Sequence, residues 1–318
     1  MKFSKLGTLI TVLSVATMFE FVSVARSAAG VALTGLAGGN TLVFFDSATP
    51  NSTTTRGVTG ADLSATLLGI DYRPANGQLY GITNNGVFAI DPASGNATLV
   101  NTISPTFNSG TISGVDFNPA ADALRITGAN GQNLRIGGGG LGATNVDGNL
   151  AYAAGDTNAG VSPTITASAY TNNFAGVPAG RTTQLFNIDS NLDTLVLQNP
   201  PNNGTLGTIG SLGVNVGTVG GFDIFSPSNG VNTAFAAFAP NGSTAASLYT
   251  IDLSTGAATS LGQIGTGAGF NLTGLAAPIS PTAVPEPSSI PGLILLGIGT
   301  GWMLKRRKHK SIAAKTGK

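Results

Sequence analysis

The chain contains no cysteine, and its central part also lacks lysine, glutamate and histidine. The single histidine is His309, and every lysine and glutamate lies before residue 29 or after residue 284. Without these residues the central part has no disulfides, no Ser-His-Asp or Cys-His catalysis, no zinc site of His or Cys ligands and no lysine Schiff base. Only aspartates remain for acid–base chemistry, and we therefore expect a protein that is not an enzyme.

Charge of either sign is also sparse. Residues 29–284 contain five arginines against twelve aspartates, which gives this body a net charge of −7. Surfaces that bind nucleic acid are basic, so nucleic acid is excluded as a partner. A hydrophobic fraction of 42% is enough for a core, and 46 glycines among 318 residues favour short strands and turns.

The first segment, residues 1–28, has the layout of a secretory signal peptide. Two lysines precede an apolar run over 6–18, and small residues at 27–29 offer a cleavage site. We expect the Sec export machinery and signal peptidase to act on this segment. An uncleaved anchor is the alternative, because Glu20 and Arg26 are unusual near a cleavage site. In both cases the body leaves the cytoplasm.

The last segment, residues 280–318, has three parts in a fixed order. Pro285-Glu286-Pro287 is followed by an apolar run over 290–304 and by a basic tail over 305–318 that begins with Lys305-Arg306-Arg307. As a helix the apolar run would span about 23 Å, short of a hydrocarbon core of roughly 30 Å. It is a marginal membrane anchor, and its basic tail is expected on the cytoplasmic side.

This order of parts resembles a bacterial PEP-CTERM sorting signal. The resemblance implies recognition by an exosortase-type membrane protease, removal of the tail, and release to the cell surface or into the extracellular polysaccharide matrix. An ordinary short tail anchor is the alternative. We therefore expect an exported protein that is held transiently at the inner membrane and then reaches the surface or the outside.

Between the two signals, residues 29–279 repeat one phrase: glycine, an apolar residue, aspartate, and a proline a few residues later. Copies begin at Gly69, Gly114 and Gly221, and fainter ones at Ala167 and Gly274, so that the steps are 45, 53, 54 and 53 residues. Short strand-like segments separated by turn residues follow each copy. Units of about 50 residues with four short strands are typical of propeller blades.

The two ends of this body predict how the ring closes. Residues 34–58 resemble strands two to four of a blade, and residues 272–278 resemble a first strand alone. Joining them completes one blade, so we expect an all-β fold with a single five-bladed propeller closed by N- and C-terminal strands. A pair of β-sandwiches or a β-solenoid is the alternative.

The body also resembles the exported domain-of-unknown-function family 4394. The stretches that carry the resemblance are Gly69 to Ile82, Gly114 to Gly131, Gln198 to Leu206 and Ser247 to Asp252. Members of this family look like propellers, so the resemblance implies a fold and no particular activity.

Aspartates are the candidate functional residues. Asp71, Asp116 and Asp223 occupy the same place in the repeated phrase, on the strand expected to be innermost in each blade. One interpretation is that they face a central channel together and form a ligand-binding face. The other is that they bond to neighbouring backbone and hold the blades in register.

Calcium is the one metal that a set of carboxylate, carbonyl and hydroxyl oxygens favours, and no other cofactor is expected. Asp189, Asn191 and Asp193 place oxygen donors at alternate positions, and Asp147 and Asp156 flank another loop. Aspartate followed by small polar residues is also typical of tight hairpins. We favour this second interpretation for Asp189.

We therefore predict a non-enzymatic propeller of the bacterial envelope or exopolysaccharide matrix. This prediction depends on the two sorting signals, the repeated body and the missing catalytic residue types. The propeller would bind polysaccharide or protein, or contribute structure. A carbohydrate-active hydrolase that uses aspartates alone and a calcium-stiffened surface protein are the alternatives.

Overall fold

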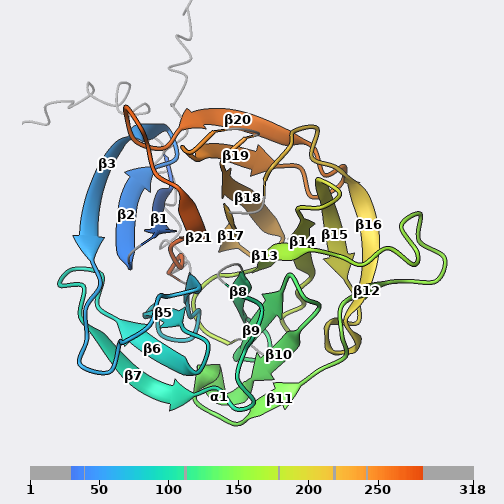
Figure 1. The fold of residues 1–318 in the computed structure, drawn as a ribbon, viewed down its shortest axis with the longest axis horizontal. Helices are drawn as coiled ribbons and strands as arrows, with labels where there is room; N and C mark the ends of the chain where they lie inside the picture. The colour runs from blue at the N-terminus through green and yellow to red at the C-terminus, as the bar shows by residue number, and fades with distance from the viewer. Residues whose placement is uncertain are drawn as a thin grey trace, which may run out of the picture.

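The fold is described from a computed structural model (Figure 1). The structure describes residues 30–38, 40–110, 113–177, 180–217, 220–240 and 243–281. The predicted signal peptide and the predicted sorting signal, with its apolar helix over 290–304, lie outside these residues. Within the described part of the chain, no helix is long and apolar enough to cross a bilayer.

Five β-sheets surround a common axis, and each sheet is one blade of a propeller (Figure 1). From the axis outward, blade 1 consists of β21 (Leu272–Ala276), β1 (Ala32–Ala37), β2 (Thr41–Asp46) and β3 (Thr49–Gly57). Blade 2 consists of β4 (Gly69–Tyr72), β5 (Leu79–Ile82), β6 (Gly86–Ile90) and β7 (Ala97–Thr102). Blade 3 consists of β8 (Ser113–Asn118), β9 (Ala123–Gly128), β10 (Asn133–Ile136) and β11 (Thr144–Val146).

Blade 4 consists of β13 (Ile165–Tyr170), β14 (Leu185–Asp189), β15 (Thr194–Gln198) and β16 (Thr205–Ser211), with the short β12 (Ala151–Tyr152) pairing in parallel outside β16. Blade 5 consists of β17 (Gly220–Ser228), β18 (Val231–Phe238), β19 (Ser247–Ile251) and β20 (Ala258–Gln263). A tight turn, α1 (Gly137–Gly140), follows β10 and has left-handed backbone at Gly138 and Gly139. A 3-10 turn, η1 (Pro201–Asn203), follows β15.

The predicted five-bladed propeller is confirmed, and the sandwich and solenoid alternatives are excluded. The innermost strands begin within two residues of the five copies of the repeated phrase, at Gly69, Ser113, Ile165, Gly220 and Leu272. The phrase therefore marks the strand of each blade that lines the axis.

The ring closes where the two ends of the body meet. Strand β1 pairs with β2 on one side and with β21 on the other, and Leu36 lies opposite Gly274 in the second pairing. Figure 1 shows these two strands, blue and red, side by side in one blade. Every sheet thus has its full set of strands, as predicted from residues 34–58 and 272–278.

The glycine of the repeated phrase is required by crowding at the axis. A Cβ atom at Gly221 would lie 2.3 Å from the backbone nitrogen of Leu275, and one at Gly114 would lie 2.1 Å from Oγ of Ser168. Neither position has room for a side chain. This close approach brings the main chain of one blade within reach of side chains on its neighbour.

The spaces between blades differ in chemistry. Apolar clusters join blades 1 and 2, 2 and 3, 4 and 5, and 5 and 1. Between blades 3 and 4, buried polar side chains meet instead, among them Arg125, Asn133, Asn187 and Gln198. Burial of apolar area therefore stabilises most of the ring, and between blades 3 and 4 a network of polar side chains takes the place of an apolar cluster.

Replacing Leu36 by alanine tests the closure. Leu36 is fully buried in the cluster between blades 1 and 2, so Leu36→Ala is expected to lower the free energy of unfolding by about 2–5 kcal/mol in urea denaturation. Leu99→Ala, at a partly exposed position on β7, is the control and should cost less than about 1 kcal/mol. Equal losses for the two variants would contradict a core built around the closing strand.

Candidate functional site

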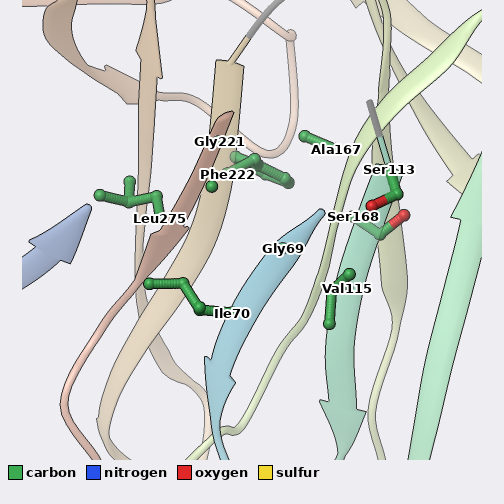
Figure 2. Close-up of a pocket in the computed structure, with 10 residues that line it drawn as sticks. Gly69, Ile70, Ser113, Val115, Ala167, Ser168, Gly221, Phe222 and Leu275 are labelled. Atoms are coloured by element: carbon green, nitrogen blue, oxygen red, sulfur yellow. The ribbon is translucent and has the colours of Figure 1, made fainter. Parts of the chain in front are cut away.

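The propeller axis contains a small cavity (Figure 2). Residues from all five innermost strands line it, including Gly69, Ser113, Ser168, Gly221 and Leu275. Its volume is about 10 Å³, which is room for about one water molecule. A sugar ring does not fit in a space of this size.

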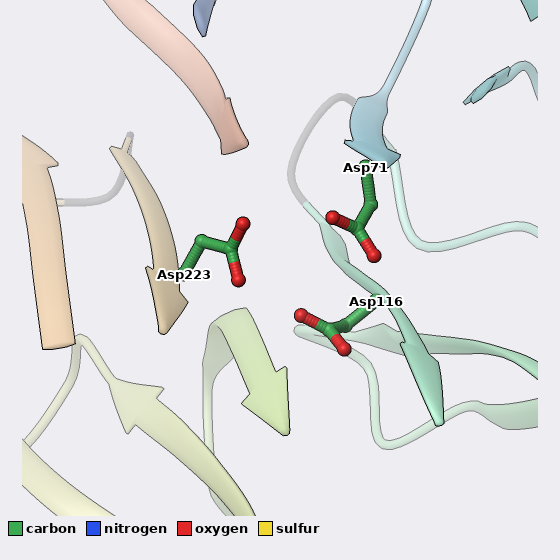
Figure 3. Close-up of side chains that lie close together, drawn as sticks. All are labelled: Asp71, Asp116 and Asp223. Carbon is green, nitrogen blue, oxygen red and sulfur yellow. The ribbon is translucent and has the colours of Figure 1, made fainter. Parts of the chain in front are cut away.

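The three aspartates of the repeated phrase converge beside this cavity (Figure 3). Asp71, Asp116 and Asp223 come from β4, β8 and β17, and each is at most 1% exposed. Their carboxylates point toward one another, and one oxygen of each lies within 4.8 Å of those of the other two. Blades 4 and 1 carry Ala169 and Ala276 at the equivalent position.

Two of these carboxylates hold neighbouring blades together. Oδ2 of Asp71 accepts a hydrogen bond of 2.8 Å from the backbone N–H of Phe117 in blade 3. Oδ2 of Asp223 accepts one from the backbone N–H of Ala277, just after the innermost strand of blade 1. In both residues Oδ1 accepts from the next N–H of its own strand. Each aspartate therefore connects its own blade to the next one around the ring.

Asp116 differs from the other two. Both of its oxygens are buried, and among the described residues neither has a hydrogen-bond partner. The backbone N–H of Tyr170 in blade 4 is near enough to lower the pKa of Asp116, but it forms no hydrogen bond of normal geometry to either oxygen. A buried carboxylate without donors is stable only when something neutralises its charge.

Burial raises the pKa of all three carboxyl groups. The pKa of Asp71 is well above its usual range because of burial and the nearby charge of Asp223. For Asp116 the causes of the raised pKa are burial and the charges of Asp71 and Asp223. Burial raises the pKa of Asp223 to about 6, although its two backbone hydrogen bonds oppose the shift.

A larger cleft opens between blades 3 and 4, which the sequence did not reveal. It has a volume of about 500 Å³, and its lining includes Asn118, Arg125, Arg135, Pro201, Asn202 and Asn203. Arg125 is 2% exposed, whereas 31% of the Arg135 side chain is exposed. The cleft therefore offers one accessible guanidinium, side-chain amides and a proline wall.

Asp147 holds the two arginines of the cleft. Arg125 and Arg135 lie directly opposite each other on β9 and β10, where like charges repel. Oδ2 of Asp147 accepts a hydrogen bond of 2.7 Å from Nη1 of Arg125 and one of 3.0 Å from Nε of Arg135. The carboxylate of Asp147 thus balances one of the two guanidinium charges. The three side chains together keep one net positive charge.

Buried hydrogen bonds connect this cleft to the axis. Arg125 donates to the side-chain oxygens of Asn133 and Asn202. The network continues through Gln198, which donates to Asn133, and Asn187, which donates to Gln198, and ends at Ser168 in the wall of the axial cavity. A satisfied network of this kind holds its members in one arrangement.

The residues named as calcium candidates lie at the hairpin between β14 and β15. The carboxylate of Asp189 is buried and accepts from the hydroxyl of Tyr152 and from the backbone N–H groups of Thr164 and Asn191. Asp193 accepts from the backbone N–H of Val216. These contacts are those of a turn, and calcium binding here stays a prediction.

Asp147 and Asp156, the other two aspartates considered at a loop, do not share a binding site. Asp147 binds the two arginines of the cleft. Asp156 accepts from the backbone and hydroxyl of Thr208. Their carboxylates therefore serve separate contacts.

One signal for the cleft was present in the sequence. Arg125 stands between Leu124 and Ile126 in a strand that reads as buried, and a buried arginine needs a partner. The sequence around Arg125 does not indicate that Asn202, 77 residues away, accepts one of its hydrogen bonds.

The fold and these sites define a closed five-bladed propeller with buried carboxylates at its axis. The chain belongs to the family described as Domain of unknown function (DUF4394), which matches residues 41–276. The family resemblance seen in the sequence is thereby confirmed. No curated protein matches the chain in sequence.

Several solved structures are similar to this chain in fold. A structural genomics protein of unknown function from Bacteroides thetaiotaomicron VPI-5482 is 18% identical, with a TM-score of 0.42 over 80% of this chain and 64% of that one. An auxiliary nutrient binding protein from Bacteroides ovatus ATCC 8483 is 14% identical, with a TM-score of 0.34 over 56% and 46%. Hydrazine synthase of Kuenenia stuttgartiensis is 12% identical, with a TM-score of 0.37 over 66% and 53%. The chain thus spans 46% to 64% of the length of these proteins.

The raised pKa values predict how stability depends on pH. A carboxyl group whose pKa is raised by folding stabilises the fold below its unfolded pKa of about 3.9, and this contribution is lost as the pH rises through the folded pKa. That folded pKa is about 6 for Asp223 and well above the usual range for Asp71 and Asp116. In the presence of a chelator, the free energy of unfolding should therefore fall from pH 5 to pH 8, and Asp223 alone should contribute about 1 kcal/mol to this decline.

Asp116→Asn should make this decline shallower, because the variant removes the titration of one of the three carboxyl groups and leaves the buried Asp71 and Asp223 in place. The body has no histidine or glutamate to titrate in the same range, so the comparison is direct. Urea denaturation at each pH measures it. A stability that rises from pH 5 to pH 8 in the wild-type protein would contradict the assignment.

Proposed function

We propose that this protein is an exported, non-enzymatic binding propeller of the bacterial envelope or exopolysaccharide matrix, and that the cleft between blades 3 and 4 takes its ligand. The cleft itself carries the proposal. Its volume of about 500 Å³ falls within the range of small-ligand sites, and it combines an apolar wall with a few fixed polar groups.

The lining of the cleft suits an acidic saccharide. Side-chain amides of Asn202 and Asn203 can both donate to and accept from sugar hydroxyls, and the partly exposed guanidinium of Arg135 can bind a carboxylate with two hydrogen bonds. The ion pairs leave one net positive charge in a body whose net charge is −7. A uronate residue of an extracellular polysaccharide matches this charge and size.

Pre-organisation also favours binding here. Arg125 is held by Asp147, Asn133 and Asn202, so its side chain is ordered before any ligand arrives. Binding to such a site costs little side-chain entropy. The cleft needs no closing segment to become complete.

The same residues argue against a hydrolase that uses aspartates alone. A glycosidase needs two carboxyl groups on either side of an accessible glycosidic bond. In the cleft, Asp147 is bound to two arginines, and at the axis the free space beside the aspartates holds about one water. Neither place offers a free pair of carboxyl groups next to room for a sugar.

Location is the part of the proposal that depends on the sequence alone. The segment over 1–28 supports export through the Sec machinery and signal peptidase. Pro285-Glu286-Pro287, the apolar run over 290–304 and Lys305-Arg306-Arg307 support sorting by an exosortase-type protease. Both segments support a location of the body outside the cytoplasm, where extracellular polysaccharide is found.

Arg135→Gln tests the binding site. Isothermal titration with acidic polysaccharide from the producing bacterium should give saturable binding to the wild-type protein. The variant should bind at least about 10-fold more weakly, because it loses a charge-assisted bidentate contact while the Arg125–Asp147 pair remains.

Arg56→Gln is the matched control, since Arg56 is an exposed arginine on β3 of blade 1. It should bind like the wild-type protein. Binding that is unchanged in Arg135→Gln, or that weakens equally in the control, would place the ligand elsewhere or show only a general charge effect.

A further inference from the structure

The carboxylate of Asp116 is not explained by the role of its two neighbours. It is fully buried, both oxygens lack hydrogen-bond partners among the described residues, and it is aimed at Asp71 and Asp223 (Figure 3). In blades 4 and 1 the equivalent residue is alanine, so a blade does not need a carboxylate at this position to take its place in the ring. Holding blades together therefore does not account for Asp116.

No basic side chain of the described body is assigned to the three carboxylates. Arg73 pairs with Asp122, Arg125 and Arg135 pair with Asp147, and Arg181 lies over the ring of Phe174. Arg56, the fifth arginine of the body, is exposed on the outermost strand β3 of blade 1, and the body contains no lysine. Among the described residues, no positively charged side chain therefore balances this cluster.

We propose that Asp71, Asp116 and Asp223 bind one hard divalent cation at the propeller axis, and that Ca²⁺ fits their spacing best. Two oxygens bound to the same Ca²⁺ at 2.3–2.6 Å are at most about 5 Å apart. The three carboxylates meet this limit, since one oxygen of each lies within 4.8 Å of the others. Their ligand atoms are all oxygens, which favours Ca²⁺, Mg²⁺ or Mn²⁺ over softer metals.

The hydrogen bonds already present leave room for coordination. A carboxylate has about four lone-pair positions, and Asp71 and Asp223 each use two of them for backbone N–H groups. Neither oxygen of Asp116 has a hydrogen-bond partner of normal geometry among the described residues.

A cation in this place would join three blades through side chains on three innermost strands. It would stabilise the ring at neutral pH, where the three carboxylates otherwise repel one another. This inference does not depend on the ligand of the cleft between blades 3 and 4, because the two sites share none of their proposed ligand-binding residues.

The test is metal content and thermal stability of the full-length protein. After treatment with a chelator and dialysis against Ca²⁺ at pH 7.5, mass spectrometry of the metal should find one Ca²⁺ per chain. With 1 mM CaCl₂ and a Kd of about 10 μM, Tm should rise by about 5–10 °C over the chelated protein. Failure of Ca²⁺, Mg²⁺ and Mn²⁺ alike to bind or to raise Tm would overturn the proposal.

Two substitutions locate the site. Asp116→Asn and Asp116→Ala should both lose the bound Ca²⁺ and the rise in Tm, and alanine is a residue that two other blades already carry at this position. Asp62→Asn, at an exposed aspartate, is the control and should keep both. Full calcium content in both Asp116 variants would overturn the proposal by placing the ion elsewhere, for example at the Asp189 hairpin.

Discussion

The close approach of the innermost strands is the constraint on which the rest of this propeller depends. Glycine at the start of the repeated phrase lets the main chain of one blade come within reach of a side chain on the next. Aspartate two residues later uses that approach, as in the bonds from Phe117 to Asp71 and from Ala277 to Asp223. The same geometry forces carboxylates from three blades to share one buried space, where burial raises the pKa of each.

One pair of blades meets through polar groups, and this exception produces the larger cleft. Buried arginine is tolerated between blades 3 and 4 because Asp147, Asn133 and Asn202 satisfy it. A buried polar network is satisfied only when all of its members are in place. It therefore allows fewer arrangements of blades 3 and 4 than an apolar contact would. As a result, two arginines and one aspartate lie at the cleft, and their net positive charge is the basis of the proposed binding of an acidic ligand.

The architecture was accessible from the sequence because it is periodic. A phrase that recurs every 45 to 54 residues marks the innermost strands, and the incomplete units at the two ends predict the closing blade. The convergence of Asp71, Asp116 and Asp223 followed from the same register. By contrast, the lack of a hydrogen-bond partner for Asp116 depends on the exact distances between neighbouring blades. The cleft combines Arg125, Arg135 and Asn202 from separate strands and turns. No local pattern encodes such distances.

Three buried carboxylates that converge at the axis are the central claim of this account. A carbon-13 NMR titration of the aspartate carboxyl groups, in the presence of a chelator, measures them directly. The account predicts that Asp71, Asp116 and Asp223 titrate well above pH 4, with Asp223 near pH 6, among the twelve aspartates of the body. If all twelve titrate at or below pH 4, the carboxylates are not buried together and the account of the axis is wrong.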